Sequence, residues 1–406
     1  MHSTSATPDD VPFLDLLDPT FQLDAESVRC ARDASWYART PLGFAVLGYA
    51  EVAALLKDRR LRQGGPDSLA AQGVTSGPLF DWMRQIILNV EGADHSRLRR
   101  LVTHAFTPAA VEALRPRMRA VAHELIDRFA DRGECDFMDE FADPYPSRII
   151  CELLEVPREL HSQFNGWAND LGLAFSQTVA QHRERIEAAV VGLHASVDAL
   201  VAKRRRNPGQ DLISALIASE EAGERLSDQE LRVMVSALIF GGQDTTRNQL
   251  GRALVTFLEH PDQWTLLGDW PELAPTAVEE VLRASPAVPA IWRVATESFE
   301  FNGLAIPAGT FLQLLTDTAN ADPAVFGLTR LDITQSRPAQ LTFGGGIHYC
   351  LGAPLARAEL AEALPILAAR LRQPSLAGEV WWRPALGIYG PLVLPIRFTA
   401  ERRAAA

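Results

Sequence analysis

Cysteine is scarce in this sequence, and the few cysteines lie far apart. Only four occur among 406 residues, at positions 30, 135, 151 and 350, and no two of them form a CxxC pair. This spacing disfavours a structural zinc site. It also disfavours a disulfide framework and favours a reducing compartment, so it predicts a cytoplasmic protein.

The sequence also lacks a basic excess and a long apolar run. Its net charge is −12, which disfavours binding to nucleic acid. No run of about 18 apolar residues occurs, and the N-terminus has neither the basic nor the apolar part of a signal peptide. We therefore expect no membrane anchor. The 47% hydrophobic content is enough for a substantial buried core.

No linker-like change of composition and no internal repeat divides the chain, so we predict one domain over residues 1–406, with residues 1–25 as a loose leader. Residues 62–79, rich in Gly, Ser and Gln, predict a long surface loop. Apolar residues at three- and four-residue spacing predict helices over 109–132, 146–154, 158–175, 180–206, 210–219, 275–284 and 351–372. Strand patterns gather at 291–296, 299–301, 304–306 and 311–315. The predicted fold class is mainly α with a small β-rich region.

One stretch, residues 341–360, passes from three consecutive glycines to a cysteine and then to a helical pattern. The glycines at 344–346 suit a tight loop pressed against something flat. Cys350 stands where the loop becomes a helix, and a helix N-terminus lowers the pKa of a thiol. Cys350 is therefore a candidate nucleophile or metal ligand, although a single loop cysteine is more often inert.

A long helix is predicted from the capping box at Ser227–Glu230 to His260. Its middle reads GGQDTT over residues 241–246, and two glycines with two threonines are poor helix formers. We expect the helix to break there. Either a functional site or a packing kink under a crossing helix explains such a break.

Two charged pairs complete the pattern. His95 and Arg99 are four residues apart on one helix face, and Glu280 and Arg283 are three apart on another. A Cys–His protease is disfavoured because residues two apart in an extended loop, such as His348 and Cys350, point to opposite sides. A dinucleotide fingerprint is also incomplete, because a tyrosine replaces its last glycine.

A haem bound through a thiolate accounts for all these features together. The flat macrocycle explains the glycine loop, and its iron explains a single thiolate. The acid and alcohol at Asp244 and Thr245 would deliver protons to bound oxygen. The two propionates need cations, and the candidates are His95, Arg99, Arg293 and His348.

The segment FGGGIHYCLG at 343–352 resembles the cysteine loop of the cytochrome P450 monooxygenases, F-x-x-G-x-x-x-C-x-G. It matches at Phe343, Gly346, Cys350 and Gly352. The family's ExxR motif, its oxygen-activating stretch and its propionate-binding helix are similar to the segments at 280–283, 241–246 and 95–99. The resemblance extends from about residue 40 to the C-terminus. It implies a single fold with a long central helix over haem b (iron protoporphyrin IX), of the soluble bacterial type.

The resemblance also implies residue roles. Cys350 is the axial ligand of the haem iron, with Phe343 and Gly352 in the cofactor loop. Glu280 and Arg283 are structural, and Asp244 and Thr245 are catalytic. The residues implied to face the substrate are mostly apolar: Ile86, Ile87, Ala237, Phe240, Gly241, Pro289, Ala290 and Ile388.

The implied reaction inserts one oxygen atom of O₂ into a lipophilic small molecule, typically by C–H hydroxylation. Electrons would come from a ferredoxin and its reductase docking on the cysteine side of a monomer. Three alternatives stay open: oxidative coupling, action on a carrier-bound secondary-metabolite intermediate, and a haem sensor or electron carrier. The segment VFGLTRLDITQ at 325–335 is one residue shorter than the family's usual loop, which predicts a reshaped loop without loss of haem.

Overall fold

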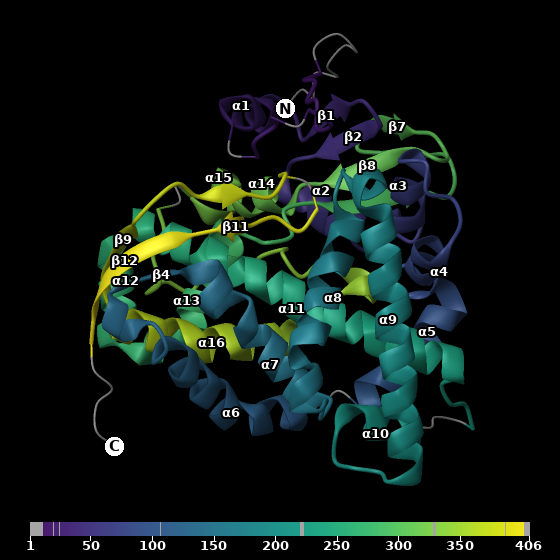
Figure 1. Ribbon diagram of the computed structural model, residues 1–406. Coiled ribbons are helices and arrows are strands. Elements are labelled where there is room, and N and C mark those ends of the chain that lie inside the picture. Colours follow the sequence, from purple (N-terminus) through teal and green to yellow (C-terminus); the bar gives the residue numbers. More distant parts are fainter. Residues whose placement is uncertain are drawn as a thin grey trace.

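A computed structural model describes residues 11–401 except 19, 24, 106, 220–222, 328–329 and 386. Helices dominate it, as predicted, and small sheets lie at its edges (Figure 1). The α-helices are α1 (Glu26–Ala34), α2 (Tyr49–Leu55), α3 (Gly65–Ala71), α4 (Pro78–Gln85), α5 (Gly92–Ala105), α6 (Pro108–Ile126), α7 (Pro144–Leu153), α8 (His161–Gly172), α9 (Val179–Arg206), α10 (Leu212–Ala218), α11 (Asp228–Glu259), α12 (Pro261–Asp269), α13 (Ala274–Ala284), α14 (Thr316–Asn320), α15 (Pro323–Phe326) and α16 (Ala353–Arg370).

The predicted β-rich patch is confirmed, and it joins strands from the N-terminal region. The strands are β1 (Tyr37–Thr40), β2 (Gly43–Val46), β3 (Leu61–Gln63), β4 (Glu134–Asp136), β5 (Ile291–Ala295), β6 (Phe299–Phe301), β7 (Leu304–Ile306), β8 (Phe311–Leu314), β9 (Leu371–Leu376), β10 (Trp381–Trp382), β11 (Pro391–Val393) and β12 (Pro395–Ala400). The largest sheet has the order β1-β2-β8-β5-β3, and its β2–β8 pair is parallel. β4, β12 and β9 form a second sheet.

Helix α11 crosses the middle of the molecule above α16 (Figure 1). The predicted capping box is present, because the side chains of Ser227 and Glu230 each accept a hydrogen bond from the other residue's backbone N–H. The predicted break at 241–246 is wrong, since α11 runs without interruption. A Cβ on Gly242 would lie 3.0 Å from Cδ1 of Ile150 on α7. Gly242 therefore allows α7 to pack closely against α11, and the backbone hydrogen bonds of α11 continue through this glycine.

Part of the segment predicted as a loose leader, residues 1–25, packs against the rest of the protein. Leu14 and Leu16 are buried, and they pack against the first sheet and α1. The backbone N–H of Leu14 donates to the carbonyl of Arg39 at 2.9 Å. From residue 11 onward, apolar burial therefore fixes the segment, and residues 1–10 lie outside the described part of the chain.

The predicted surface loop at 62–79 is also wrong, because helix α3 lies within it. Pro66 stands in the first turn of α3, where proline suits a helix start, and Leu69 is buried. The glycines on both sides of this short helix led to the prediction of a loop. Among the described residues, no helix is long and apolar enough to cross a membrane.

Candidate active site

The cysteine loop is built on left-handed glycines. Gly344 and Gly346 have φ values of +72° and +65°, which residues with a Cβ rarely adopt. A Cβ on Gly346 would lie 2.9 Å from the carbonyl oxygen of Leu56. The glycine at 346 therefore allows close contact with the end of α2, whereas the predicted contact of this loop with a flat ligand stays a prediction. The loop closes where the N–H of Cys350 donates to the carbonyl of Phe343 at 3.0 Å.

Cys350 precedes α16, as predicted, but its thiol is not activated by this position alone. Burial raises the pKa of the Cys350 thiol above its ordinary value. The backbone N–H groups of Gly352 and Ala353 and the charges of Arg99 and Arg357 act in the opposite direction. The expected lowering of the pKa is therefore wrong for the protein alone, because desolvation outweighs the helix N-terminus. A metal ion on the sulfur would deprotonate it outright.

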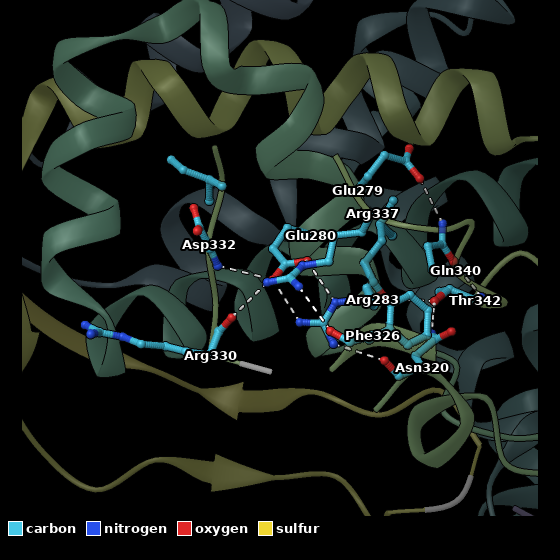
Figure 2. Close-up of polar contacts among 12 residues, drawn as sticks. Glu279, Glu280, Arg283, Asn320, Phe326, Arg330, Asp332, Arg337, Gln340 and Thr342 are labelled. Carbon is cyan, nitrogen blue, oxygen red and sulfur yellow. Dashed lines mark hydrogen bonds and ion pairs between the residues drawn. The ribbon is translucent and has the colours of Figure 1, made fainter. Parts of the chain in front are cut away.

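Glu280 and Arg283 form a buried, two-fold hydrogen-bonded ion pair on α13 (Figure 2). Nε and Nη2 of Arg283 each donate to a carboxylate oxygen of Glu280 at 2.8 Å. Arg337 approaches the same carboxylate at 3.2 Å, and the backbone N–H of Asp332 donates to it at 3.2 Å. The pair therefore anchors the long segment that leads into the cysteine loop.

The network continues from Arg283 to the start of that loop. Nη1 of Arg283 donates to the carbonyl of Asn320 at 3.0 Å. The side chain of Asn320 accepts from the N–H of Leu341 at 2.8 Å and donates to Thr342 at 3.0 Å (Figure 2). Sequence reasoning missed Asn320 and Arg337, because neither has a spacing that links it to Glu280.

Histidines and arginines gather beside the cysteine loop. The rings of His95 on α5 and His348 in the loop meet edge to face, 4.6 Å between centroids. Nε2 of His348 lies 3.0 Å from a carboxylate oxygen of Glu91. Burial, with the nearby His348 and Arg99, lowers the pKa of His95 to about 4. His95 is therefore neutral at pH 7, and its buried Nδ1 has no hydrogen-bond partner among the described residues.

Arg293 of β5 completes this cluster. It is buried, and its Nη1 donates to Oε1 of Gln63 at 2.7 Å. Burial lowers the pKa of Arg293 to about 10, although Glu91 opposes this shift. Arg99 has no carboxylate partner in the described part of the chain. The structure thus brings together the four residues predicted to bind the propionates, with His95 neutral and Glu91 as the acidic neighbour.

Helix α11 has an accessible face in the middle of an otherwise buried segment. Ala237 and Thr245 are partly exposed and Gly241 is exposed, whereas Phe240 and Asp244 are buried. Residues four apart lie on one side of a helix. A Cβ added to Gly241 would meet no atom within 4 Å. An open space therefore borders this face, and the hydroxyl of Thr245, which donates to the Gly241 carbonyl at 2.8 Å, lies beside it.

Comparisons with known proteins agree with this geometry. The family model "Cytochrome P450" matches residues 72–265 and 272–371. Luteothin monooxygenase of Streptomyces thioluteus is 43% identical over 96% of this chain and 97% of its own length. The chain belongs to the cytochrome P450 family. Mycinamicin IV hydroxylase/epoxidase of Micromonospora griseorubida is 35% identical over 97% of this chain and 99% of its own.

Solved P450 structures have the same fold. Cytochrome P450 CYP109Q5 from Chondromyces apiculatus aligns with a TM-score of 0.86 at 32% identity, covering 96% of this chain and 99% of that one. P450BioI, solved in complex with a fatty-acid-ligated acyl carrier protein, aligns with a TM-score of 0.84 at 32% identity, over 94% and 99%. The protein is therefore a cytochrome P450 monooxygenase, and the family's cofactor is haem b. The oxygenating relatives favour an enzyme over the sensor or electron-carrier hypothesis.

The residues of the site fit haem b. Cys350 is half-buried at the end of its loop, and an accessible face of the central P450 helix surrounds Gly241. The buried Nδ1 of His95 has no partner within the described residues, and Arg99 has no carboxylate there. Haem b requires one soft ligand for its iron and several hydrogen-bond donors for the carboxylates of its two propionates.

Asp244, the acid of the predicted acid–alcohol pair, is hydrogen-bonded to residues other than Thr245. Asp244 is buried, and both its oxygens accept hydrogen bonds from Arg383, at 2.8 and 2.9 Å. The side chain of Asn248 donates to the same carboxylate at 3.2 Å. No hydrogen bond joins Asp244 to Thr245 among those of the described residues. Sequence reasoning missed Arg383, which is 139 positions away.

Arg383 belongs to the β10–β11 hairpin and lines a cavity of about 320 Å³. The cavity lies between this hairpin, the end of α8 and the start of α9, and Arg247 and Ile388 also line it. Ile388 lies in the connection between β10 and β11, the two strands of this hairpin.

Arg383→Gln is expected to destabilise the protein by about 3–5 kcal/mol, because it leaves the Asp244 charge buried without its cation. Urea unfolding of the variant and the wild type measures this difference. Arg372→Gln is the matched control: its ion pair with Asp269 is 27% and 51% exposed, so we expect a loss of at most about 1 kcal/mol. Equal losses for the two variants would contradict the role of the buried pair.

The predicted substrate-facing residues divide into two groups. Phe240 stacks on Phe175 with 4.9 Å between ring centroids, and Trp82 meets both rings edge to face. Ile86, Ile87 and Phe240 pack in the main core cluster, which Ile388 also joins. Ala290, by contrast, is buried in the core cluster of the first sheet. The placement of Ala290 and Pro289 beside the substrate stays a prediction.

Proposed function

We propose that this P450 hydroxylates a lipophilic secondary metabolite at a C–H bond beside Gly241 and Thr245. The accessible face of α11 carries this proposal, because it places an apolar surface and one hydroxyl group against the same space. Relatives are named as a monooxygenase of luteothin and a hydroxylase/epoxidase of mycinamicin IV, which supports a substrate of this class.

In the proposed site, the Cys350 sulfur would bind the haem iron. Arg99, Arg293 and His95 would donate hydrogen bonds to the propionates, and His348, which Glu91 holds, would lie beside them. When bound, the haem would supply the activation of dioxygen, which a thiolate ligand at Cys350 would promote. The aromatic side chains of Phe240 and its neighbours exclude water from the reacting C–H bond.

Proton delivery is assigned to Asp244 and Thr245. Thr245 holds a proton on Oγ1 at the open face of α11, and Asp244 replaces that proton from the solvent side. Because Arg383 holds both oxygens of Asp244, the carboxylate must turn away from Arg383 to do so. The cavity lined by Arg383 is the proposed entry for water.

Thr245→Ala is expected to keep haem binding but to uncouple electron use from product formation, because the hydroxyl that holds the proton is gone. General acid–base groups contribute about 10²–10⁴-fold in rate. Product and hydrogen peroxide, each measured per electron consumed, report the change. Thr245→Ser keeps the hydroxyl and should stay close to the wild type. A coupling ratio for Thr245→Ala equal to that of the wild type would remove the role.

A shift of the haem spin state on ligand binding tests the substrate class. We expect shifts with macrolides or other secondary metabolites and none with short polar compounds. A second candidate is a carrier-tethered intermediate, favoured because the similar P450BioI was solved with an acyl carrier protein. Binding of the same compound only when it is carried on an acyl carrier protein would select this candidate.

For the electron supply, we propose a ferredoxin-type donor that docks on the cysteine side of a cytoplasmic monomer. Ile347 and Tyr349 in the loop are 50% and 40% exposed, which gives this side an apolar contact surface. Ile347→Glu should slow reduction by the donor without changing the spectrum of the haem. An unchanged rate of reduction would argue for another docking face.

A further inference from the structure

An arginine of α16 lies against the cysteine loop from the side of the helix. The guanidinium carbon of Arg357 is 4.5 Å from the centroid of the Phe343 ring, within the range of a cation–π contact. Its Nη1 donates to the hydroxyl of Tyr349 at 3.1 Å. The carbonyl of Phe343 accepts the N–H of Cys350. Arg357 therefore contacts both ends of the loop that carries the thiolate.

A carboxylate of α13 compensates this positive charge. Nε of Arg357 is 2.5 Å from Oε1 of Glu279, and Nη2 is 3.2 Å from Oε2. Glu279 also accepts from Gln340 at 3.3 Å, as Figure 2 shows. Although burial opposes it, hydrogen bonds to Glu279 and Tyr349 raise the pKa of Arg357. Both partners are charged, and they are only 35% and 44% exposed.

We propose that the Glu279–Arg357 pair sets the reduction potential of the bound haem, with Arg357 raising it and Glu279 lowering it. The proposal rests on the assignment of Cys350 as the iron ligand. Reduction adds one electron to the iron, so a nearby positive charge stabilises the reduced state and a negative charge destabilises it. Charge and hydrogen bonding around the sulfur are the means by which proteins tune such a centre.

The geometry adds to this argument in two ways. The guanidinium lies over the apolar ring of Phe343, which covers one of its faces, so less water screens the charge than at an open surface. Nη1 of Arg357 also donates to the hydroxyl of Tyr349, the residue before Cys350, which fixes the guanidinium beside the ligand. Arg99 has no described carboxylate partner, whereas Arg357 has one, so Glu279 controls how much of that charge the haem experiences.

The test is a double-mutant cycle in the midpoint potential of the purified holoprotein, measured by spectroelectrochemistry. Glu279→Gln should raise the potential, because the charge of Arg357 is left uncompensated. Arg357→Gln should lower it. The double variant should return close to the wild type. Arg117→Gln and Glu152→Gln break a pair of similar exposure between α6 and α7, and they should leave the potential unchanged.

The signs of the two changes in midpoint potential distinguish an electrostatic effect of the pair from a structural distortion of the cysteine loop. A merely structural pair, once broken from either side, would move the potential in the same direction in both variants. Shifts of equal sign, or no shift in either, would overturn the proposal while leaving the ligand assignment intact. If the reduced wild type with carbon monoxide lacks the band of a thiolate-ligated haem, the assignment of Cys350 fails, and this proposal fails with it.

Discussion

Cys350→Ala is expected to abolish monooxygenase activity and the carbon monoxide band of a thiolate-ligated haem. The loop around Cys350 is held by Gly344, Gly346 and the Cys350 backbone N–H, none of which depends on the sulfur atom. The variant should therefore fold and lose only the ligand that donates electron density to the iron. Circular dichroism, haem content and the carbon monoxide spectrum separate these outcomes.

The matched control is Cys151→Ala. Cys151 is buried on α7, and burial raises its pKa to about 12, so it is an inert thiol in a core position. We expect the control to keep the band and the activity. A retained band in Cys350→Ala, or its loss in Cys151→Ala, would contradict the assignment.

Glu280→Gln is expected to cost at least about 3–5 kcal/mol of stability and most of the haem-binding capacity. The change removes one buried negative charge from between Arg283 and Arg337, which leaves two cations without compensation. Since domains are stable by only about 5–15 kcal/mol, this loss is a large fraction of the total. The urea midpoint and the haem retained per polypeptide measure it.

Glu112→Gln serves as the control, because Glu112 and Arg115 have the same three-residue spacing at the surface of α6. This pair is 62% and 30% exposed, so its loss should leave the urea midpoint close to that of the wild type. A small effect for Glu280→Gln would mean that the segment leading to Cys350 is held by contacts other than this network.

The parts of the fold set by local pattern were predictable. The strands at 291–306 and the helices α9 and α13 lie within one or two residues of their predicted bounds, because their periodicity and their turn residues agree. The capping box of α11 is likewise a local signal. The motif around Cys350 was enough to predict the family, since four fixed residues at fixed spacing describe one loop.

What could not be predicted depends on contacts between distant segments. Gly242 looked like a helix break, yet it makes room for Ile150. The engagement of Asp244 by Arg383 joins α11 to the C-terminal hairpin, and no spacing in the sequence indicates it. The pKa of Cys350 is raised, and not lowered as predicted, because the effect of burial outweighs that of the helix N-terminus. Leu14, in the segment predicted as a loose leader, is likewise buried by contacts with segments that are distant in the sequence.

The most direct test of the account is the absorption spectrum of the purified wild type, reduced with dithionite and exposed to carbon monoxide. Thiolate ligation through Cys350 predicts the long-wavelength Soret band that gives the P450 family its name, with one haem per chain. A band at the shorter wavelength of a histidine- or thiol-ligated haem in a folded, haem-loaded sample would contradict the central claim.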